Sequence, residues 1–115
     1  MVTVDDVREV ALGLPRAYEA LVRGRVKFRV GRIVFVAFSA DETLMGFGFP
    51  RDERQALVDS EPDKFQLPGK ADMRYQWVVA RMEALDQVEM RELVTDAWRM
   101  CVPKKVAREF LGEAE

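Results

Sequence analysis

The chain has 115 residues, a formal net charge of −2 and 49% hydrophobic residues, which suits a single domain with one core over residues 1–115. It contains no histidine and one cysteine, so internal disulfides, Cys/His zinc clusters and Ser-His or Cys-His nucleophile pairs are excluded within the chain. We therefore expect a protein that is not an enzyme, with no catalytic residues, no metal site and no cofactor.

The compartment is also suggested by the sequence. No apolar run approaches the ~20 residues needed to cross a bilayer. The first residues lack the basic segment and hydrophobic core of a signal peptide, and a lone cysteine suits a reducing environment. We expect a cytoplasmic protein that does not engage a membrane.

The first expected element is a helix over residues 4–13. Thr3 and Asp6 resemble a capping box at its start, and apolar residues follow at helical spacing. Gly13 and Pro15 supply the stop signal.

A hairpin is expected next, with strands over residues 25–30 and 33–39 joined by Gly31 and Arg32 in a two-residue type II′ turn. The register predicted from this turn pairs Phe28 with Phe35 and Val30 with Ile33 on the core face. On the opposite face it places three apolar residues of the second strand, namely Val34, Val36 and Phe38.

The remaining expected elements are strands over 43–49, 65–67 and 73–82 and helices over 50–59, from residue 86, and over 104–111. In the first of these strands, Gly46 and Gly48 share one face, which suggests the close approach of another element or a bulge. The long last-but-one helix carries an apolar stripe made of Met90, Leu93, Val94, Ala97, Trp98 and Cys101. The order α-β-β-β-α-β-β-α, followed by the short final helix, predicts an α+β domain with an antiparallel sheet and helices on one face.

Basic residues are concentrated in one part of the chain. Extended as a strand, residues 23–29 would place four cations on one face, namely Arg23, Arg25, Lys27 and Arg29, with Val26 and Phe28 on the other. Such a ridge could contact phosphates, as a β-ribbon does against DNA, or it could be a solvated or charged edge strand. Arg32 lies just beyond it. Lys104 and Lys105 could extend the surface, or could be ordinary charges of the last helix.

Several aromatic residues and the lone cysteine are further candidate site residues. Trp77 and Trp98 could stack on bases, but both are expected in the core, whereas Arg74 and Tyr75 are expected to be exposed. Cys101 lies on an apolar helix stripe with no histidine to activate it, so we expect an inert thiol.

Several segments together resemble the MmcQ/YjbR-like family, and the resemblance extends over nearly the whole chain. The segments are Val4-Asp5-Asp6-Val7-Arg8-Glu9, Leu12-Gly13-Leu14-Pro15, Lys27-Phe28-Arg29-Val30-Gly31-Arg32-Ile33-Val34-Phe35, Trp77-Val78-Val79-Ala80-Arg81-Met82, Met90-Arg91-Glu92-Leu93-Val94 with Ala97-Trp98, and Pro103-Lys104-Lys105. The resemblance implies a frataxin-like (CyaY-like) fold and DNA binding by a double-wing arrangement of strands, and it carries over no catalytic residue.

One departure from the family and one ambiguous likeness to frataxin limit what the resemblance implies. Many members have a histidine shortly before the long-strand tryptophan, and here that stretch is Met73-Arg74-Tyr75-Gln76. Frataxin binds iron through carboxylates of its first helix, and Asp5, Asp6 and Glu9 could be likened to them. Acidic residues at a helix start are nevertheless ordinary dipole complementation.

Two functions remain open from the sequence. The first is weak, non-specific DNA binding without catalysis, through Arg23, Arg25, Lys27, Arg29, Arg32, Lys104 and Lys105. The alternative is a protein-interaction or adaptor module that uses apolar residues on the open sheet face, and a ligand pocket between sheet and helices is a weaker third. Phosphate binding falls steeply with salt, whereas an apolar protein interface barely responds, so salt dependence separates the first two.

Overall fold

A six-stranded antiparallel sheet with strand order β1-β2-β3-β4-β6-β5 organises the computed structural model, which describes residues 1–113. The strands are β1 (Ala17–Val22), β2 (Arg25–Val30), β3 (Ile33–Phe38), β4 (Leu44–Gly48), β5 (Phe65–Gln66) and β6 (Trp77–Arg81). The helices are α1 (Val4–Leu12), α2 (Arg54–Ser60), α3 (Gln87–Arg99) and α4 (Lys104–Leu111), with 3₁₀ turns η1 (Lys70–Asp72) and η2 (Met82–Ala84). The predicted α+β class is confirmed.

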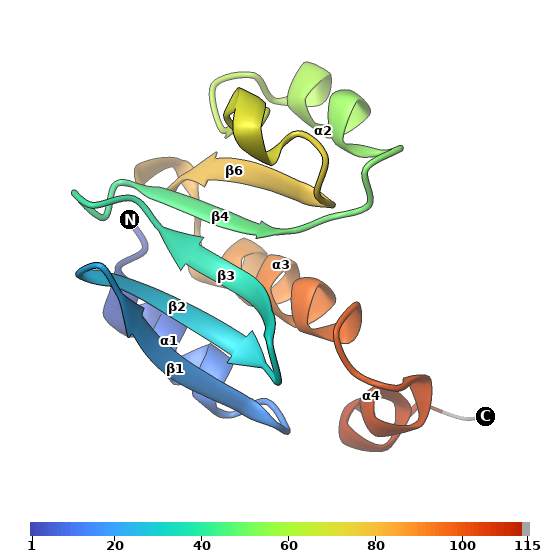
Figure 1. Cartoon of the computed structure of the whole chain (residues 1–115). Coiled ribbons are helices and arrows are strands. Elements are labelled where there is room, and N and C mark those ends of the chain that lie inside the picture. The colour runs from blue at the N-terminus through green and yellow to red at the C-terminus, as the bar shows by residue number, and fades with distance from the viewer. Residues whose placement is uncertain (114–115) are drawn as a thin grey trace.

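Helices α1 and α3 pack together on the same face of the sheet (Figure 1). Between them and the sheet lies the core, which includes Phe28, Phe47, Val94 and Trp98, each 0% exposed. Helix α2 lies at the β5 edge, and α4 lies beyond the end of α3. We call the sheet surface opposite α1 and α3 the open face. Within residues 1–113, no helix is both long enough and apolar enough to cross a membrane.

The predicted starts of α1 and α3 are confirmed by their caps. The Thr3 hydroxyl accepts a hydrogen bond from the Asp6 backbone N–H at 3.2 Å, and the Asp6 carboxylate accepts one from the Thr3 N–H at 2.9 Å. At the start of α3, the Asp86 carboxylate accepts the Glu89 N–H at 2.7 Å. These side chains satisfy N–H groups that a helix start leaves without partners.

The predicted element order misses one strand. Residues 17–22 form β1, which pairs antiparallel with β2 from Val22–Arg25 to Ala17–Val30. The turn between them is Arg23-Gly24, and both residues have positive φ, at 53° and 76°. That pattern is typical of a two-residue type I′ hairpin turn. Arg23 therefore lies in a turn, and its predicted place on the strand is wrong.

The β2–β3 register is confirmed at the turn and wrong beyond it. Gly31 takes a positive φ of 58°, and Val30 pairs with Ile33 as predicted. A β-bulge then shifts the pairing, so that Phe28 lies opposite Val36 instead of Phe35. Phe35 and Val36 are both 0% exposed.

The bulge changes which residues reach the open face. Phe38 packs edge-on against Phe28, with ring centroids 6.2 Å apart, and both side chains are buried in the core. The predicted exposure of Val36 and Phe38 is therefore wrong, and of the three apolar residues expected beside the cations only Val34 lies on the open face.

Two predicted boundaries also move. Residues 51–53 form a turn, so α2 begins at Arg54 and not at Pro50. Strand β6 begins at Trp77 and not at Met73. The reason is a side chain: backbone carbonyls of residues 73–77 accept hydrogen bonds from Arg54, which directs the segment away from the sheet ladder.

Candidate nucleic-acid interface

Three cations of β2 project from the open face. We call Arg25, Lys27 and Arg29 the basic ridge. Side chains alternate along a strand, and on the opposite side of β2 Phe28 and Val30 are buried under the helices while Val26 is half-buried. Within residues 1–113, no side chain of the ridge forms an ion pair. The Nε of Arg29 is buried and has no hydrogen-bond partner among the described residues. The ridge can therefore supply donors to an anion.

The other predicted site residues fall into two groups. Arg23 lies in the turn before β2 and Arg32 in the turn after it, so these two arginines flank the ridge at its ends. A shallow hollow at the first end is lined by Val22, Arg23, Arg25 and Lys27. Lys104 and Lys105 lie in the first turn of α4, off the sheet (Figure 1). The structure does not bring them onto the open face.

The strand residues of the open face include no acidic residue. Cross-strand partners share a face, so the pairing defines its members as Tyr18, Ala20, Val22, Arg25, Lys27, Arg29, Val34, Ala37, Leu44, Gly46, Gln66, Trp77, Val79 and Arg81. Gly48, at the end of β4, instead faces Ala97 of α3. Among the strand residues, all of them in the described part of the chain, the only carboxylate is Glu19. Glu19 faces the helices, where Arg8 Nε donates to it at 2.7 Å. The open face is thus purely cationic in a chain of net charge −2.

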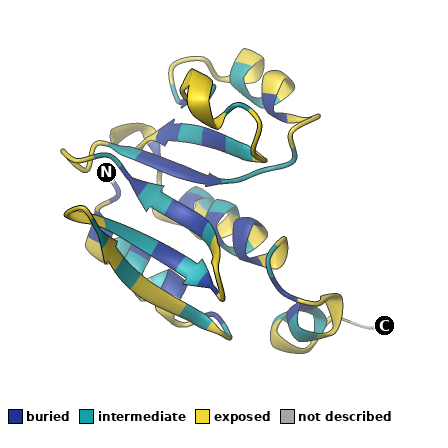
Figure 2. Cartoon of the chain, viewed as in Figure 1, coloured by how far each residue is buried: buried dark blue, intermediate teal, exposed yellow. Residues whose placement is uncertain are grey.

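Burial follows the same division of faces. Buried and half-buried residues alternate along β2 and β6 in Figure 2, whereas β1 at the sheet edge is largely exposed or half-buried. Arg25 is exposed, and Lys27 and Arg29 are half-buried. The stems of these two cations are thus partly packed while their charges remain unpaired, which is the usual behaviour of long cationic side chains on a sheet.

Trp77 lies on the open face, which corrects its predicted place in the core. Its half-buried indole reaches over Gly46 of β4, where a Cβ would lie 2.5 Å from Nε1 and 2.7 Å from Cζ2. The predicted close approach to a strand glycine is confirmed at Gly46. Trp98, in contrast, is 0% exposed as predicted, and its Nε1 donates to the Pro15 carbonyl at 2.8 Å.

A buried arginine that was not predicted from the sequence fixes the segment before Trp77 through hydrogen bonds to its backbone carbonyls. Arg54 is 6% exposed, and its guanidinium donates to the carbonyls of Met73 at 2.6 Å, Tyr75 at 2.9 Å and Trp77 at 3.3 Å. An arginine within the helix predicted over residues 50–59 gives no sign of such burial. In this segment the Arg74 guanidinium stacks on the Tyr75 ring, 4.8 Å from its centroid, and both side chains are exposed as predicted.

The carboxylates of α1 are engaged by the protein itself. Asp5 pairs with Arg8, and Asp6 completes the helix cap. The hydrogen bond from the Thr3 backbone holds the pKa of Asp6 below its usual value. No group of three or more potential metal-ligating His, Cys, Asp or Glu side chains occurs within residues 1–113.

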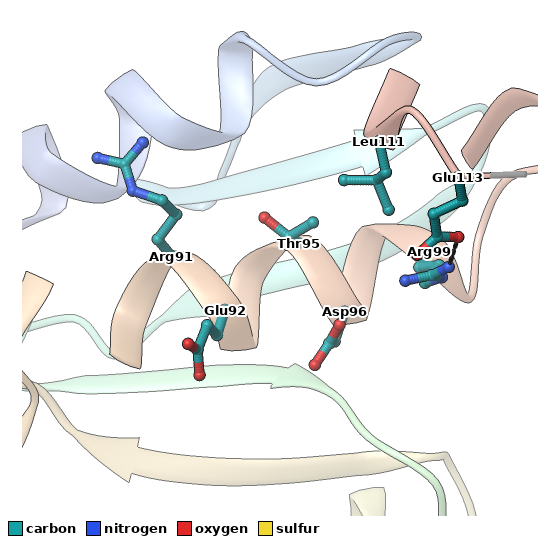
Figure 3. Close-up of a pocket in the computed structure, with 7 residues that line it drawn as sticks. All are labelled: Arg91, Glu92, Thr95, Asp96, Arg99, Leu111 and Glu113. Carbon is teal, nitrogen blue, oxygen red and sulfur yellow. Dashed lines mark hydrogen bonds and ion pairs between the residues drawn. The ribbon is translucent and has the colours of Figure 1, made fainter. Parts of the chain in front are cut away.

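The thiol and a second surface hollow offer little chemistry. Cys101 is half-buried, its thiol donates to the Ala97 carbonyl at 3.5 Å, and burial raises its pKa, which keeps it protonated. A broad depression on the outer side of α3 is lined by Arg91, Glu92, Thr95, Asp96, Arg99, Leu111 and Glu113 (Figure 3). It mixes both charges, and Arg99 pairs with Glu113 across it. No single class of ligand is favoured there.

Fold and site together define an α+β protein with an open cationic sheet face. A family model described as YjbR matches residues 12–100, well over half of the sequence, and the chain belongs to the YjbR family. The crystal structure of Deinococcus radiodurans protein DR2400, which carries the domain DUF419, matches with a TM-score of 0.77 at 20% identity, covering 99% of this chain and 91% of that one. At that identity the likeness shows the fold. No curated protein matches the sequence.

Proposed function

We propose that this protein binds DNA through the basic ridge, with Arg23 and Arg32 at its ends, and that it catalyses no reaction. The observation that carries the proposal is the open face, whose cations lack ion-pair partners within residues 1–113 and whose strands present no carboxylate there. A surface of this kind attracts phosphates even when the molecule as a whole is acidic.

The spacing of the ridge suits a phosphate backbone. Alternate residues of a strand lie about 6.6 Å apart, so three cations form a row about 13 Å long. Nothing on the strand resembles a recognition helix with base-reading side chains, and phosphate contacts carry no sequence information. We expect weak binding that is largely independent of sequence.

The family resemblance supports the same reading. It implies DNA binding and a double-wing arrangement of strands, and we extend the proposal to a frataxin-like arrangement and, because a lone cysteine fits a reducing compartment, to a cytoplasmic location. The protein-interaction alternative loses support, since Val36 and Phe38, on which it drew, are buried at 0% and 3% exposure.

Charge reversal on the ridge tests the proposal. A labelled DNA of about 20 nucleotides, offered both as a single strand and as a duplex, is titrated in about 50 mM salt and followed by fluorescence anisotropy. We expect the parent to bind and R25E/K27E/R29E to lose at least about tenfold in affinity, because three phosphate contacts become repulsive. Circular dichroism checks that the variant is folded.

The matched control is R91E/K104E/K105E, which changes the net charge equally at exposed cations of α3 and α4. Its affinity should stay within about twofold of the parent. Equal losses in both variants would show that binding follows total charge and not the ridge, and absence of binding to either form of DNA would refute the function.

A further inference from the structure

On the open face, the basic ridge of β2 and the Trp77 indole, which lies over β4, are separated by the single strand β3. Lys27 pairs with Ala37, and Ala37 pairs with Gly46, over which the Trp77 indole lies. Neighbouring strands are about 4.8 Å apart, so the Cα atoms of Lys27 and Gly46 are about 10 Å apart. Only the methyl group of Ala37 stands between the cation and the aromatic ring along this line.

Both the side chain and the backbone of Trp77 are fixed in position by neighbouring residues. Gly46 leaves the room that the indole occupies, and the Trp77 carbonyl accepts a hydrogen bond from buried Arg54. An aromatic side chain fixed before a ligand arrives loses little conformational entropy on binding. Trp77 is half-buried, so the residue remains partly accessible to solvent.

We propose that the open face prefers single-stranded DNA, with phosphates on the basic ridge and a base against Trp77; this rests on the proposed DNA-binding function and specifies its substrate. A cationic strand beside an aromatic ring is the combination that single-strand binding uses. In a duplex the bases are stacked and paired inside the helix, so a duplex can reach the ridge but cannot place a base on Trp77 without being opened.

Phosphate attraction alone would give the opposite preference. A duplex carries more charge per unit length than a single strand, so purely electrostatic binding favours the duplex. Tighter binding of the single strand therefore reports a contact with the bases. The described strands place two aromatic side chains on the open face: Tyr18, whose hydroxyl donates to the Gly31 carbonyl, and Trp77, whose indole lies along the line from Lys27.

The test compares a labelled 12-mer of thymidine with a duplex of the same length at equal salt. Stacking of a base on an aromatic side chain is lost on truncation, so W77A should weaken single-strand binding by about 5- to 100-fold and change duplex binding by less than about twofold. W77F should retain part of the single-strand affinity. V88A, at an exposed side chain of α3 on the other side of the sheet, should leave both affinities within about twofold.

Intrinsic fluorescence gives a second readout. The chain has two tryptophans, and Trp98 is 0% exposed, so the single strand should quench Trp77 in the parent and should quench nothing in W77F. Equal or tighter binding of the duplex, or unchanged single-strand affinity in W77A and W77F, would overturn the preference while leaving the ridge function intact. Equal losses in V88A and W77A would also overturn it. Loss of both DNA forms in R25E/K27E/R29E tests the ridge separately.

Discussion

Arg54 shows how one buried polar side chain shapes the candidate interface. It satisfies carbonyls of residues 73–77, so the chain turns away from the sheet and β6 begins at Trp77. Replacement by Met would leave these carbonyls with fewer donors. We expect R54M to lower the free energy of unfolding by about 1–3 kcal/mol, measured by urea denaturation.

The control for R54M is R51M. Arg51 is exposed, and its guanidinium donates to the Arg74 carbonyl at 2.8 Å. Its loss should cost within about 0.5 kcal/mol, as for most surface substitutions. Equal stability of the two variants would contradict a structural role for the buried guanidinium.

Glu19 provides a prediction on pH. Hydrogen bonds from Arg8 lower the pKa of Glu19 below its ordinary value of 4.5. Because the folded-state pKa is depressed, the pair stabilises the fold above about pH 4.5, and this contribution disappears as the pH falls through the lower, folded value. A carboxyl titration by NMR should give a midpoint below 4.5 for Glu19, and the midpoint should rise in R8Q. An unchanged midpoint in R8Q would show that Arg8 is not the cause.

At the scale of the element, α3 is anchored by Trp98. Its side chain is fully buried, donates to the Pro15 carbonyl and packs edge-on against Phe110 at 5.5 Å between ring centroids. We expect W98A to cost about 3–5 kcal/mol, as for large buried aromatics. L21A, at a side chain that is 71% exposed, should cost little. A loss under about 1 kcal/mol for W98A, measured by thermal or urea unfolding, would contradict this packing.

Elements with local signals are predictable here, and those that depend on tertiary contacts are not. The caps of α1 and α3 and the turn at Gly31 are encoded by short-range chemistry, and the structure confirms them. Strand β1 reads Ala-Tyr-Glu-Ala-Leu-Val and was not predicted, because its polar and apolar residues do not alternate. It is an edge strand that the helices cover only in part, so alternation is not required there. The bulge lies within the apolar β3, where no polar residue fixes the register.

The candidate site was predictable to the same extent. Alternation of charge along residues 25–29 identifies the ridge, because period two needs only a strand. The place of Trp77 depends on which face of β6 meets the helices, and neighbouring Trp77, Val78, Val79 and Ala80 are all apolar. Arg54 gave no signal, since its partners are backbone carbonyls about twenty residues away.

At the scale of the whole molecule, charge is divided between faces. The net charge is −2, yet the strands carry cations on the open face and their one carboxylate, Glu19, on the helix side. Such a division steers a polyanion to one surface while the rest of the molecule repels it. DNA binding should therefore depend on a small number of phosphate contacts on the open face.

The salt dependence of DNA binding tests that claim most directly. Three phosphate contacts predict a slope of log affinity against log salt near −3 on duplex DNA and near −2 on a single strand. Fluorescence anisotropy titrations between about 50 and 200 mM salt measure both slopes, and R25E/K27E/R29E should abolish the salt-dependent binding. A slope near zero in the parent, or a slope and affinity unchanged in the variant, would contradict the account.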